Sequence, residues 1–276
     1  MIEIALSLAI IGFALVAIIG VLPIGMNTQK ANREETVINQ DFTVWMNAIR
    51  NGAKGLDELT NYVMAITNTA ILYVGGVPSL TNVYVYTYYD STVNGTAMSP
   101  PFPINNGLRI VGLLSTPKYL GNWADGNYIG NSVVASVRSM SGPASEKFPQ
   151  DNTAVLDLGF NYRMTSEVVP YSTNYVDPSW VDYRLPGLST EEIAARSNYW
   201  RVVRTTQANL HDVRLLFRWP LRSGGQLGLG GQSFRTLVGG WLQQTNEVDF
   251  PRPVADEPSP YDLYFLNPHS YVTNAP

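Results

Sequence analysis

The sequence opens with an uncharged apolar run, from Ile4 to Met26, that reads IALSLAIIGFALVAIIGVLPIGM. As an α-helix this run is about 34 Å long, which is enough to cross a bilayer core of roughly 30 Å. Small residues let a second backbone come close, so a helix that carries them is suited to packing against other helices. The small residues along the run are Ala5, Ser7, Ala9, Gly12, Ala14, Ala17 and Gly20.

One acid, Glu3, lies in the first turn of this predicted helix, and no basic residue precedes it. A carboxylate near the membrane interface costs much less than one at the bilayer centre, and a nearby amino group would offset that cost. The nearest such group is the α-amino group of Met1 or of a neighbouring copy. The competing interpretation is a signal anchor or an uncleaved signal peptide. A signal peptide would have a basic start, a shorter apolar core and a small-residue cleavage site.

The next stretch, Asn27 to Arg50, is predicted to continue the helix with one apolar face. Polar residues lie between the apolar ones, as in a helix that covers a globular body. Asn51 and Gly52 are typical of a helix end. The apolar side chains that recur at three- and four-residue steps are Ala31, Val37, Ile38, Phe42, Trp45, Met46 and Ile49.

Three residues inside this helix, Gly20, Pro23 and Gly25, predict a break. Proline removes one backbone hydrogen bond and clashes with the preceding turn, at about 3 kcal/mol in a helix interior. The predicted N-terminal unit is therefore an apolar half and an amphipathic half with a weak point between them.

An apolar helix with one first-turn acid, an Ile-Ile-Gly step at Gly20, a proline further on and an amphipathic second half resembles the N-terminus of mature type IV pilins and pseudopilins. The resemblance covers Met1 to about Arg50. The run FALVAIIGVLPIGMNTQKANREET is also similar to prepilin-type proteins of the planctomycete and verrucomicrobial kind. The resemblance implies a leader removed by a prepilin peptidase, a methylated N-terminus, pilus assembly machinery and a filament of identical subunits. The family acid, which neutralises the amine of an adjacent subunit, would be Glu3.

Two features depart from the family pattern. The family acid usually lies fifth from the processed end, whereas Glu3 is third. Either the register differs or two residues are missing ahead of Met1, and we expect the second. The family proline also comes about one turn earlier, relative to the acid, than Pro23 does.

Composition favours an extracellular β-rich head, because charged residues make up 14% of the chain while Tyr, Asn, Thr, Ser and Gly are abundant. The net charge is −4 with no basic stripe, so nucleic acid is not an expected partner. Cysteine is absent, which excludes disulfides and thiolate metal sites. We predict an α+β fold, in which a long helix packs on a C-terminal antiparallel sheet. Its units are the helix at 1–54, with an apolar half at 1–26 and an amphipathic half at 27–54, and a β-rich head with long loops and a proline-rich tail at 55–276.

Within the head, alternation and turn residues predict strands, short helices and loops. The predicted strands are 80–88, 108–114, 132–140, 154–162, 209–219 and 232–242. The predicted short helices are 56–67 and 190–197, and the predicted loops are 123–130 and 170–186. Ser189 and Glu192 form a capping box before the second helix. Gly239 and Gly240 predict a bulge or a close backbone approach, and 250–276 is expected to be extended.

A row of tyrosines marks a candidate surface in the strand at 80–88. Tyr84, Tyr86 and Tyr88 lie opposite two valines and, being amphipathic, suit a half-exposed sheet face or an interface. With Trp180 in the loop at 170–186, they form a candidate subunit interface or ligand surface. Asn94, in Asn-Gly-Thr, matches an N-glycosylation acceptor.

The sequence carries few residues that suit catalysis. No HExxH, GxSxG or P-loop pattern is present. His211 and His269 lie far apart in the sequence, and the run GGQLGLGG links two predicted strands. The acids between Asp177 and Asp182 supply fewer oxygens than calcium needs. We therefore expect no enzyme activity, no cofactor and no metal.

The predicted function is a structural subunit of an extracellular filament, held in the inner membrane before assembly and joined to identical subunits through its helix. Two other classes stay open. One is a minor pilin or secretion pseudopilin that caps or primes a short fibre. The other is a membrane-anchored binding or adhesion domain that never polymerises and uses the tyrosine-rich strands and the loop at 170–186 to hold a glycan or a surface.

Overall fold

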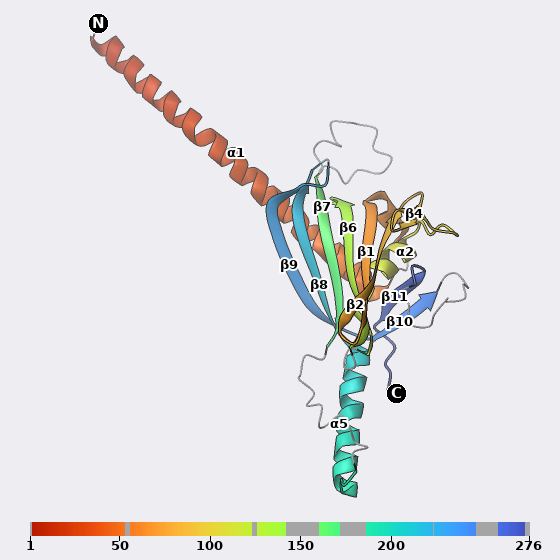
Figure 1. Cartoon of the computed structure of the whole chain (residues 1–276). Helices are drawn as coiled ribbons and strands as arrows, with labels where there is room; N and C mark the ends of the chain where they lie inside the picture. Colours follow the sequence, from red (N-terminus) through yellow and green to blue (C-terminus); the bar gives the residue numbers. More distant parts are fainter. Residues whose placement is uncertain are drawn as a thin grey trace.

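The computed structural model describes residues 2–52, 56–122, 126–141, 160–171, 186–222, 224–246 and 259–273. A 50-residue helix, α1 (Ile2–Asn51), projects from a head that is built on a large antiparallel sheet (Figure 1). This α+β architecture confirms the coarse prediction. Met1 and Trp180 lie outside the described residues, as does most of the predicted loop at 170–186.

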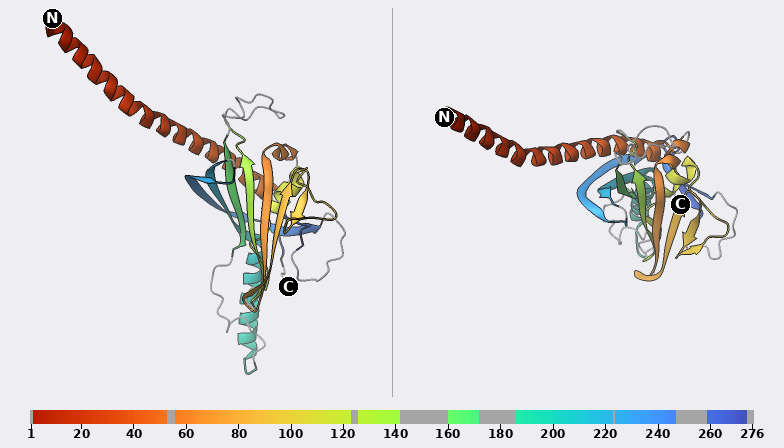
Figure 2. Two further views of the ribbon diagram at one scale, coloured as in Figure 1. Left: turned by 45° about the horizontal axis from the view of Figure 1, so that its top comes forward. Right: turned by 90° about the horizontal axis from the view of Figure 1, so that it is seen from above.

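Helix α1 is continuous through Gly20, Pro23 and Gly25, where a break was expected. The surrounding turns contain good helix formers, namely Ala17, Leu22 and Met26, and the cooperativity of helix propagation carries the helix past a local defect. Figure 2 shows that the helix bends before it reaches the head. The predicted end is confirmed, because the last helical residue is Asn51 and Gly52 follows with a φ of +74°.

The main sheet has nine strands, and its hydrogen-bonded path runs β4-β3-β2-β1-β6-β7-β8-β9, with β5 paired to β6. All pairs in it are antiparallel. The strands are β1 (Val63–Val74), β2 (Val77–Thr87), β3 (Ser91–Val93), β4 (Thr96–Ala97), β5 (Tyr119–Asn122), β6 (Asn127–Arg138), β7 (Asn161–Pro170), β8 (Leu210–Leu221) and β9 (Leu227–Gly239).

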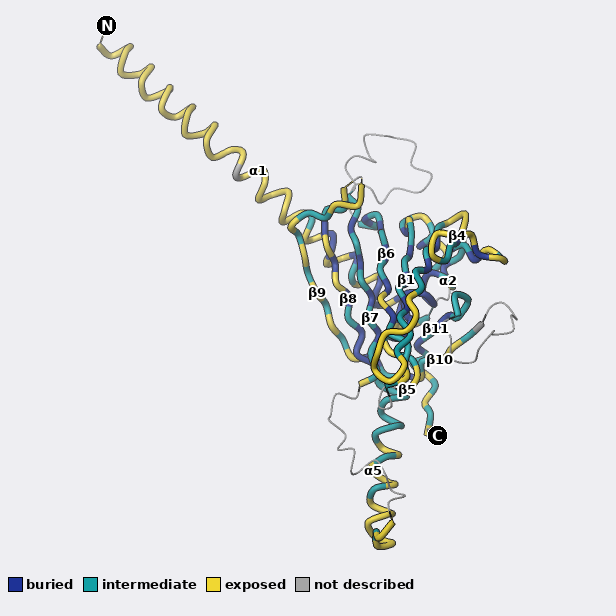
Figure 3. The backbone as a smooth tube through the Cα atoms, viewed as in Figure 1, coloured by how far each residue is buried: buried dark blue, intermediate teal, exposed yellow. Residues whose placement is uncertain are grey.

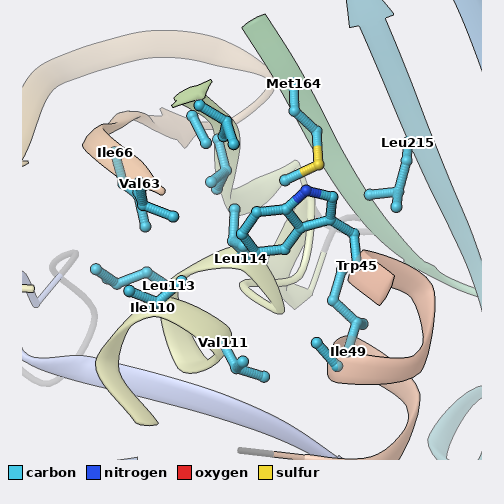
Figure 4. Packing of buried hydrophobic residues seen from close by; sticks show 14 of the residues in the cluster. Trp45, Ile49, Val63, Ile66, Ile110, Val111, Leu113, Leu114, Met164 and Leu215 are labelled. Carbon is cyan, nitrogen blue, oxygen red and sulfur yellow. The ribbon is translucent and has the colours of Figure 1, made fainter. Parts of the chain in front are cut away.

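The core lies between one face of this sheet and three elements, namely the second half of α1, helix α2 (Gly107–Leu114) and strand β11 (Asp262–Asn267), which pairs with β10 (Trp241–Asn246). Figure 4 shows the indole of Trp45 among Leu114, Met164 and Leu215, which come from α2, β7 and β8. The amphipathic half of α1 is thus a structural part of the head, and its predicted apolar face is confirmed from Val37 onward.

The predicted strand at 108–114 is wrong, because this segment forms helix α2. The Asn106 side chain caps the helix, accepting a hydrogen bond of 2.8 Å from the Arg109 amide. Short apolar runs read alike as buried helix or buried strand. Here the cap and the close approach of Gly107 to Leu56 decide for the helix.

The predicted helix at 56–67 is also wrong beyond its first turn. A five-residue 3-10 helix, η1 (Asp57–Asn61), is followed by β1, and Gly75 and Gly76 make the turn into β2. Ile66 and Ala70 of β1 are buried in the sheet core, so tertiary packing overrides the local helical pattern. In the same way, 127–130 lies in β6, where a loop was expected.

Other predicted elements are confirmed with shifted bounds. Strands β2, β6 and β8 match their predictions, and β8 forms the expected hairpin with β9. Strand β7 begins at Asn161, whereas 154–159 of the predicted strand lies outside the described residues. The segment 232–242 is interrupted at Gly240, whose φ of +127° and close approach to Asn267 confirm the expected backbone contact. In the tail, β11 is a paired strand.

Helix α5 (Thr190–Asn209) starts at the predicted capping box of Ser189 and Glu192 but is 20 residues long, well beyond its predicted end. It extends away from the end of the sheet where β8 begins (Figure 1). It has no buried residue, in contrast to α2. The two free ends, of α1 and of α5, lie at opposite ends of the molecule.

Candidate assembly surface

The first half of α1 is an exposed apolar rod (Figure 3). It is the only helix among the described residues that is long and apolar enough to cross a membrane, and no part of its most apolar stretch is buried in the chain. Exposed apolar surface of this extent marks an interaction site or a membrane contact. Its large exposed residues are Ile2, Ile4, Leu6, Leu8, Ile10, Ile11, Phe13, Leu15, Val16, Ile18, Ile19, Val21, Leu22 and Met26.

The glycines of this rod have no packing role in the single chain. A Cβ placed on Gly12, Gly20 or Gly25 would meet nothing within 4 Å. Glycine in a helix interior costs about 1 kcal/mol relative to alanine. Because nothing within the chain needs the missing side chain, the open space at these positions is available to a second helix.

Glu3 stands near the free end of the rod and is exposed. Ser7 donates its hydroxyl to the Glu3 backbone carbonyl at 2.8 Å, so that hydroxyl is satisfied within the helix. No hydrogen bond or ion pair joins the Glu3 carboxylate to another described residue. Its charge is therefore open to a partner from outside the described part of the chain.

A buried acid, Asp41, holds the other half of α1 on the sheet. Its carboxylate accepts hydrogen bonds from the backbone amides of Met140 (2.9 Å) and Ser141 (3.0 Å) and from the Tyr162 hydroxyl (3.1 Å). The Trp45 indole N–H donates to the same hydroxyl oxygen at 2.8 Å. Helix, β6 end and β7 are thereby linked through one polar cluster inside an apolar core.

Burial governs the electrostatics of this cluster. Desolvation raises the pKa of Asp41 above its usual value, although the hydrogen bonds from Met140, Ser141 and Tyr162 act to lower it. Desolvation and the neighbouring Asp41 also raise the pKa of Tyr162 well above its usual value. Asp41 was not among the residues predicted from the sequence, although it is the only charged residue between Val37 and Ile49 and so stands out on a predicted apolar face.

The predicted tyrosine surface is not formed. Tyr84 and Tyr86 are 3% and 1% exposed, and the Tyr86 hydroxyl donates to the Pro260 carbonyl at 2.8 Å. Alternation along β2 separates two faces correctly, but the tyrosines point into the core, where Tyr86 meets Phe102 edge-on. Tyr88 is exposed and lies just beyond the end of β2.

The remaining single-residue candidates stay apart from the rod. Asn94 is exposed in the turn between β3 and β4 with a φ of +50°, and its side-chain nitrogen donates to Asn82 at 3.0 Å. His211 is buried, and desolvation lowers its pKa to about 4. His269 is not buried with it.

Comparisons with known proteins give no relative from which a function could be inferred, so the function is inferred from the geometry of the chain. No protein family, no curated protein and no solved structure matches this chain. The described surface combines an apolar rod, which the chain itself leaves uncovered, with a head that holds the rod firmly at one end. Such an arrangement suits insertion into a membrane or into a bundle of like helices.

Proposed function

We propose that this protein is a structural subunit of an extracellular, type IV pilus-like filament that polymerises through the first half of α1. The observation that supports this proposal best is the exposed apolar rod on a separately packed head. A membrane anchor alone needs apolar length, but it does not need small residues with open space around them. A helix bundle uses both features.

Before assembly, the rod lies in the inner membrane with the head outside. On polymerisation the rod leaves the lipid and joins a bundle of identical rods at the filament centre. Apolar contacts with lipid are exchanged for apolar contacts with protein, so the exchange has a small net cost. Close packing at positions such as Gly12 and Gly20 then favours the bundle.

Glu3 would fix how far each rod is shifted along its neighbour in the bundle, which apolar contacts alone do not determine. In the apolar bundle its carboxylate would pair with the amino terminus of an adjacent copy, because a charge in such surroundings needs a partner. A head-to-tail contact of this kind does not close on itself, so it generates an open helical fibre. The pilus assembly machinery and the prepilin peptidase are partners on the same proposal.

The competing adhesion hypothesis relies on the tyrosines of β2 and on the loop at 170–186. Tyr84 and Tyr86 are buried, so they are not available to a ligand, whereas most of the loop lies outside the described residues. A minor pilin or pseudopilin shares the rod with a major subunit, and the abundance of this chain in isolated fibres distinguishes the two.

Glu3→Ala tests the proposal. The variant is expected to fold and to remain in the membrane, because Glu3 contacts no described part of the head, yet to form no fibres. Electron microscopy of cells and of purified protein measures fibres, and membrane fractionation measures retention. Glu35→Ala, which removes another exposed acid of α1, is the matched control and is expected to assemble normally. Normal fibres from Glu3→Ala would remove the role that we assign to this acid.

A further inference from the structure

Two arginines face each other on the open face of the sheet. Arg163 of β7 pairs directly with Arg218 of β8. Their neighbours along each strand, such as Tyr162 and Phe217, are buried in the core, so the arginines point to the opposite face. Like charges directly opposite one another destabilise a strand pair. A pair of this kind calls for a counter-charge.

Elsewhere on the same face the chain supplies that counter-charge itself. Arg214 and Arg235 are also direct cross-strand partners. Asp212 lies between them, 2.6 Å from Arg214 Nη2 and 2.8 Å from Arg235 Nε. This second arginine pair serves for comparison, because an acid of the same chain lies between its two guanidinium groups.

Arg163 and Arg218 have no such acid. Within the described ranges neither forms an ion pair, and the hydrogen bond of the Arg163 guanidinium is a long one of 3.5 Å to the Gly225 carbonyl. Arg222 follows at the exposed end of β8 and adds a third cation. This end of the open face is therefore a basic patch, made of Arg163, Arg218 and Arg222, that the described chain leaves uncompensated.

The complementary charge lies at the far end of the molecule. Helix α5 carries Glu191 and Glu192 in its first turn, at the tip that points away from the sheet (Figure 1). Both are exposed, and hydrogen bonds from Ser189 lower the pKa of Glu192, so this acid stays ionised while it caps the helix. Only the last turns of this 20-residue helix are partly covered by the head, and no residue in it is buried. A long helix that is exposed over most of its length is typical of one that bridges to another body.

We propose that the first turn of α5 in one copy binds the basic patch of the next copy along the filament. This contact rests on the proposed filament function and specifies a second, peripheral interface for it. Glu191 and Arg218 are about 50 Å apart within one chain, from the rise of α5 and of β8, so a chain cannot pair its own two ends. Identical subunits stacked in one direction bring opposite ends together, and the contact propagates because it joins two different surfaces.

Orientation supports the same pairing. The free end of α1 and the tip of α5 lie at opposite ends of the molecule in Figure 1 and in the left view of Figure 2. If the rods of all copies point one way, each α5 tip points toward the copy ahead. Apolar packing of the rods is weakly directional, so charged contacts between heads would set the spacing and make the fibres sensitive to salt.

The test uses the full chain, which has no cysteine of its own. Glu191→Cys and Arg218→Cys are combined in one variant, and purified fibres are oxidised. A disulfide needs Cα atoms within about 7 Å, so only cysteines of different copies can join. The expected result is a ladder of dimers, trimers and longer multimers on a non-reducing gel, lost on reduction. Glu58→Cys with Arg218→Cys is the matched control and is expected to give monomer.

A charge exchange provides the second measurement. Glu191→Arg alone and Arg218→Glu alone are each expected to lose most fibres, and the two substitutions combined are expected to restore them. Both positions are exposed, and neither side chain supports the core. If the unchanged chain forms fibres but the cysteine pair gives no ladder, or if the exchange restores nothing, the contact is wrong while the filament stands. If the unchanged chain forms no fibres, both proposals fail.

Discussion

The two halves of α1 belong to one continuous helix, yet they relate to the rest of the chain in opposite ways. The half before Asn27 is apolar on all sides and exposed. In the other half, apolar side chains keep to one face, and Trp45 and Ile49 are fully buried on the sheet. An apolar face can be covered by the chain's own sheet, whereas an all-round apolar rod needs a different environment. Helix length thus says less about function than the angular distribution of apolar residues.

Charge placement separates the two halves in the same way. The free half has no charge after Glu3, and its large apolar side chains are exposed. The anchored half buries one acid, Asp41, and gives it three donors from the sheet side of the interface. Buried polar groups must pair with specific partners, so they fix the orientation of the helix on the sheet. Apolar contacts are compatible with several orientations.

The strongest test of this contrast is Trp45→Ala. Removing a fully buried indole from the core is expected to lower the free energy of unfolding by about 3–5 kcal/mol. Unfolding in detergent, followed by near-ultraviolet circular dichroism, measures the change. Phe13→Ala removes an exposed aromatic from the free half and is expected to leave the stability of the head unchanged. Equal losses from the two variants would contradict the division of α1 into an anchored and a free half.

Asp41→Asn is expected to have a smaller effect, a loss of about 1–3 kcal/mol, because an amide has one acceptor oxygen to offer where the carboxylate receives three donors. The pH dependence sharpens the test. The pKa of Asp41 is raised in the folded state, so the folded protein binds more protons and its unfolding free energy falls as pH rises through the window above the ordinary pKa of 3.8.

Chemical denaturation between pH 3 and pH 7 measures the contribution of Asp41 as the difference between the slope of Asp41→Asn and the wild-type slope. Glu58→Gln, an exposed acid outside the cluster, is the control and should keep the wild-type slope. His211, whose pKa is lowered to about 4, makes the unfolding free energy rise with pH in the same window, so the sign of the Asp41 contribution is taken from this difference. A slope for Asp41→Asn that is more negative than the wild-type slope would show that the hydrogen bonds to Asp41 outweigh its desolvation.

The smallest expected effect on the subunit comes from Gly20→Ala. Nothing lies within 4 Å of the added methyl group, so the helix should gain about 1 kcal/mol, with the head unaffected. Gly112→Ala is the counterpart in the head, where the added Cβ would lie 2.8 Å from Leu263 and Phe265, and it should destabilise the fold. Helix content and thermal unfolding measure both. Fibre yield from Gly20→Ala then shows whether a second helix occupies the open space.

Local signals explain which elements could be predicted from the sequence. The end of α1 at Gly52, the capping box at Ser189 and the alternation in β8 each depend on a few neighbouring residues, and all three are confirmed. Helix α2 and strand β1 were assigned wrongly, because short apolar segments take the structure that buries them best. That outcome depends on β11 and on the sheet, far away in sequence.

The residues of the candidate site also differ in whether local sequence is enough to predict them. The apolar run and Glu3 are visible in the sequence because they need no tertiary partner within the chain. Asp41 was missed because its role depends on two amides and Tyr162, about 100 residues or more away. The tyrosines of β2 were misplaced because alternation distinguishes two faces of a strand without telling which face a helix will cover.

The clamp of Asp41, Trp45 and Tyr162 gives α1 the mechanics of a lever. About 52 Å of helix precedes Val37, the first residue of α1 that is buried on the head, so a tilt of about five degrees at the clamp moves the tip by about 4.5 Å, close to the width of a side chain. A small change in the tilt of α1 at Asp41 would thus become a large displacement of Glu3. Hydrogen bonds with fixed geometry limit this tilt more than apolar contacts alone would. Every copy of the protein therefore holds the free end of α1 in the same orientation.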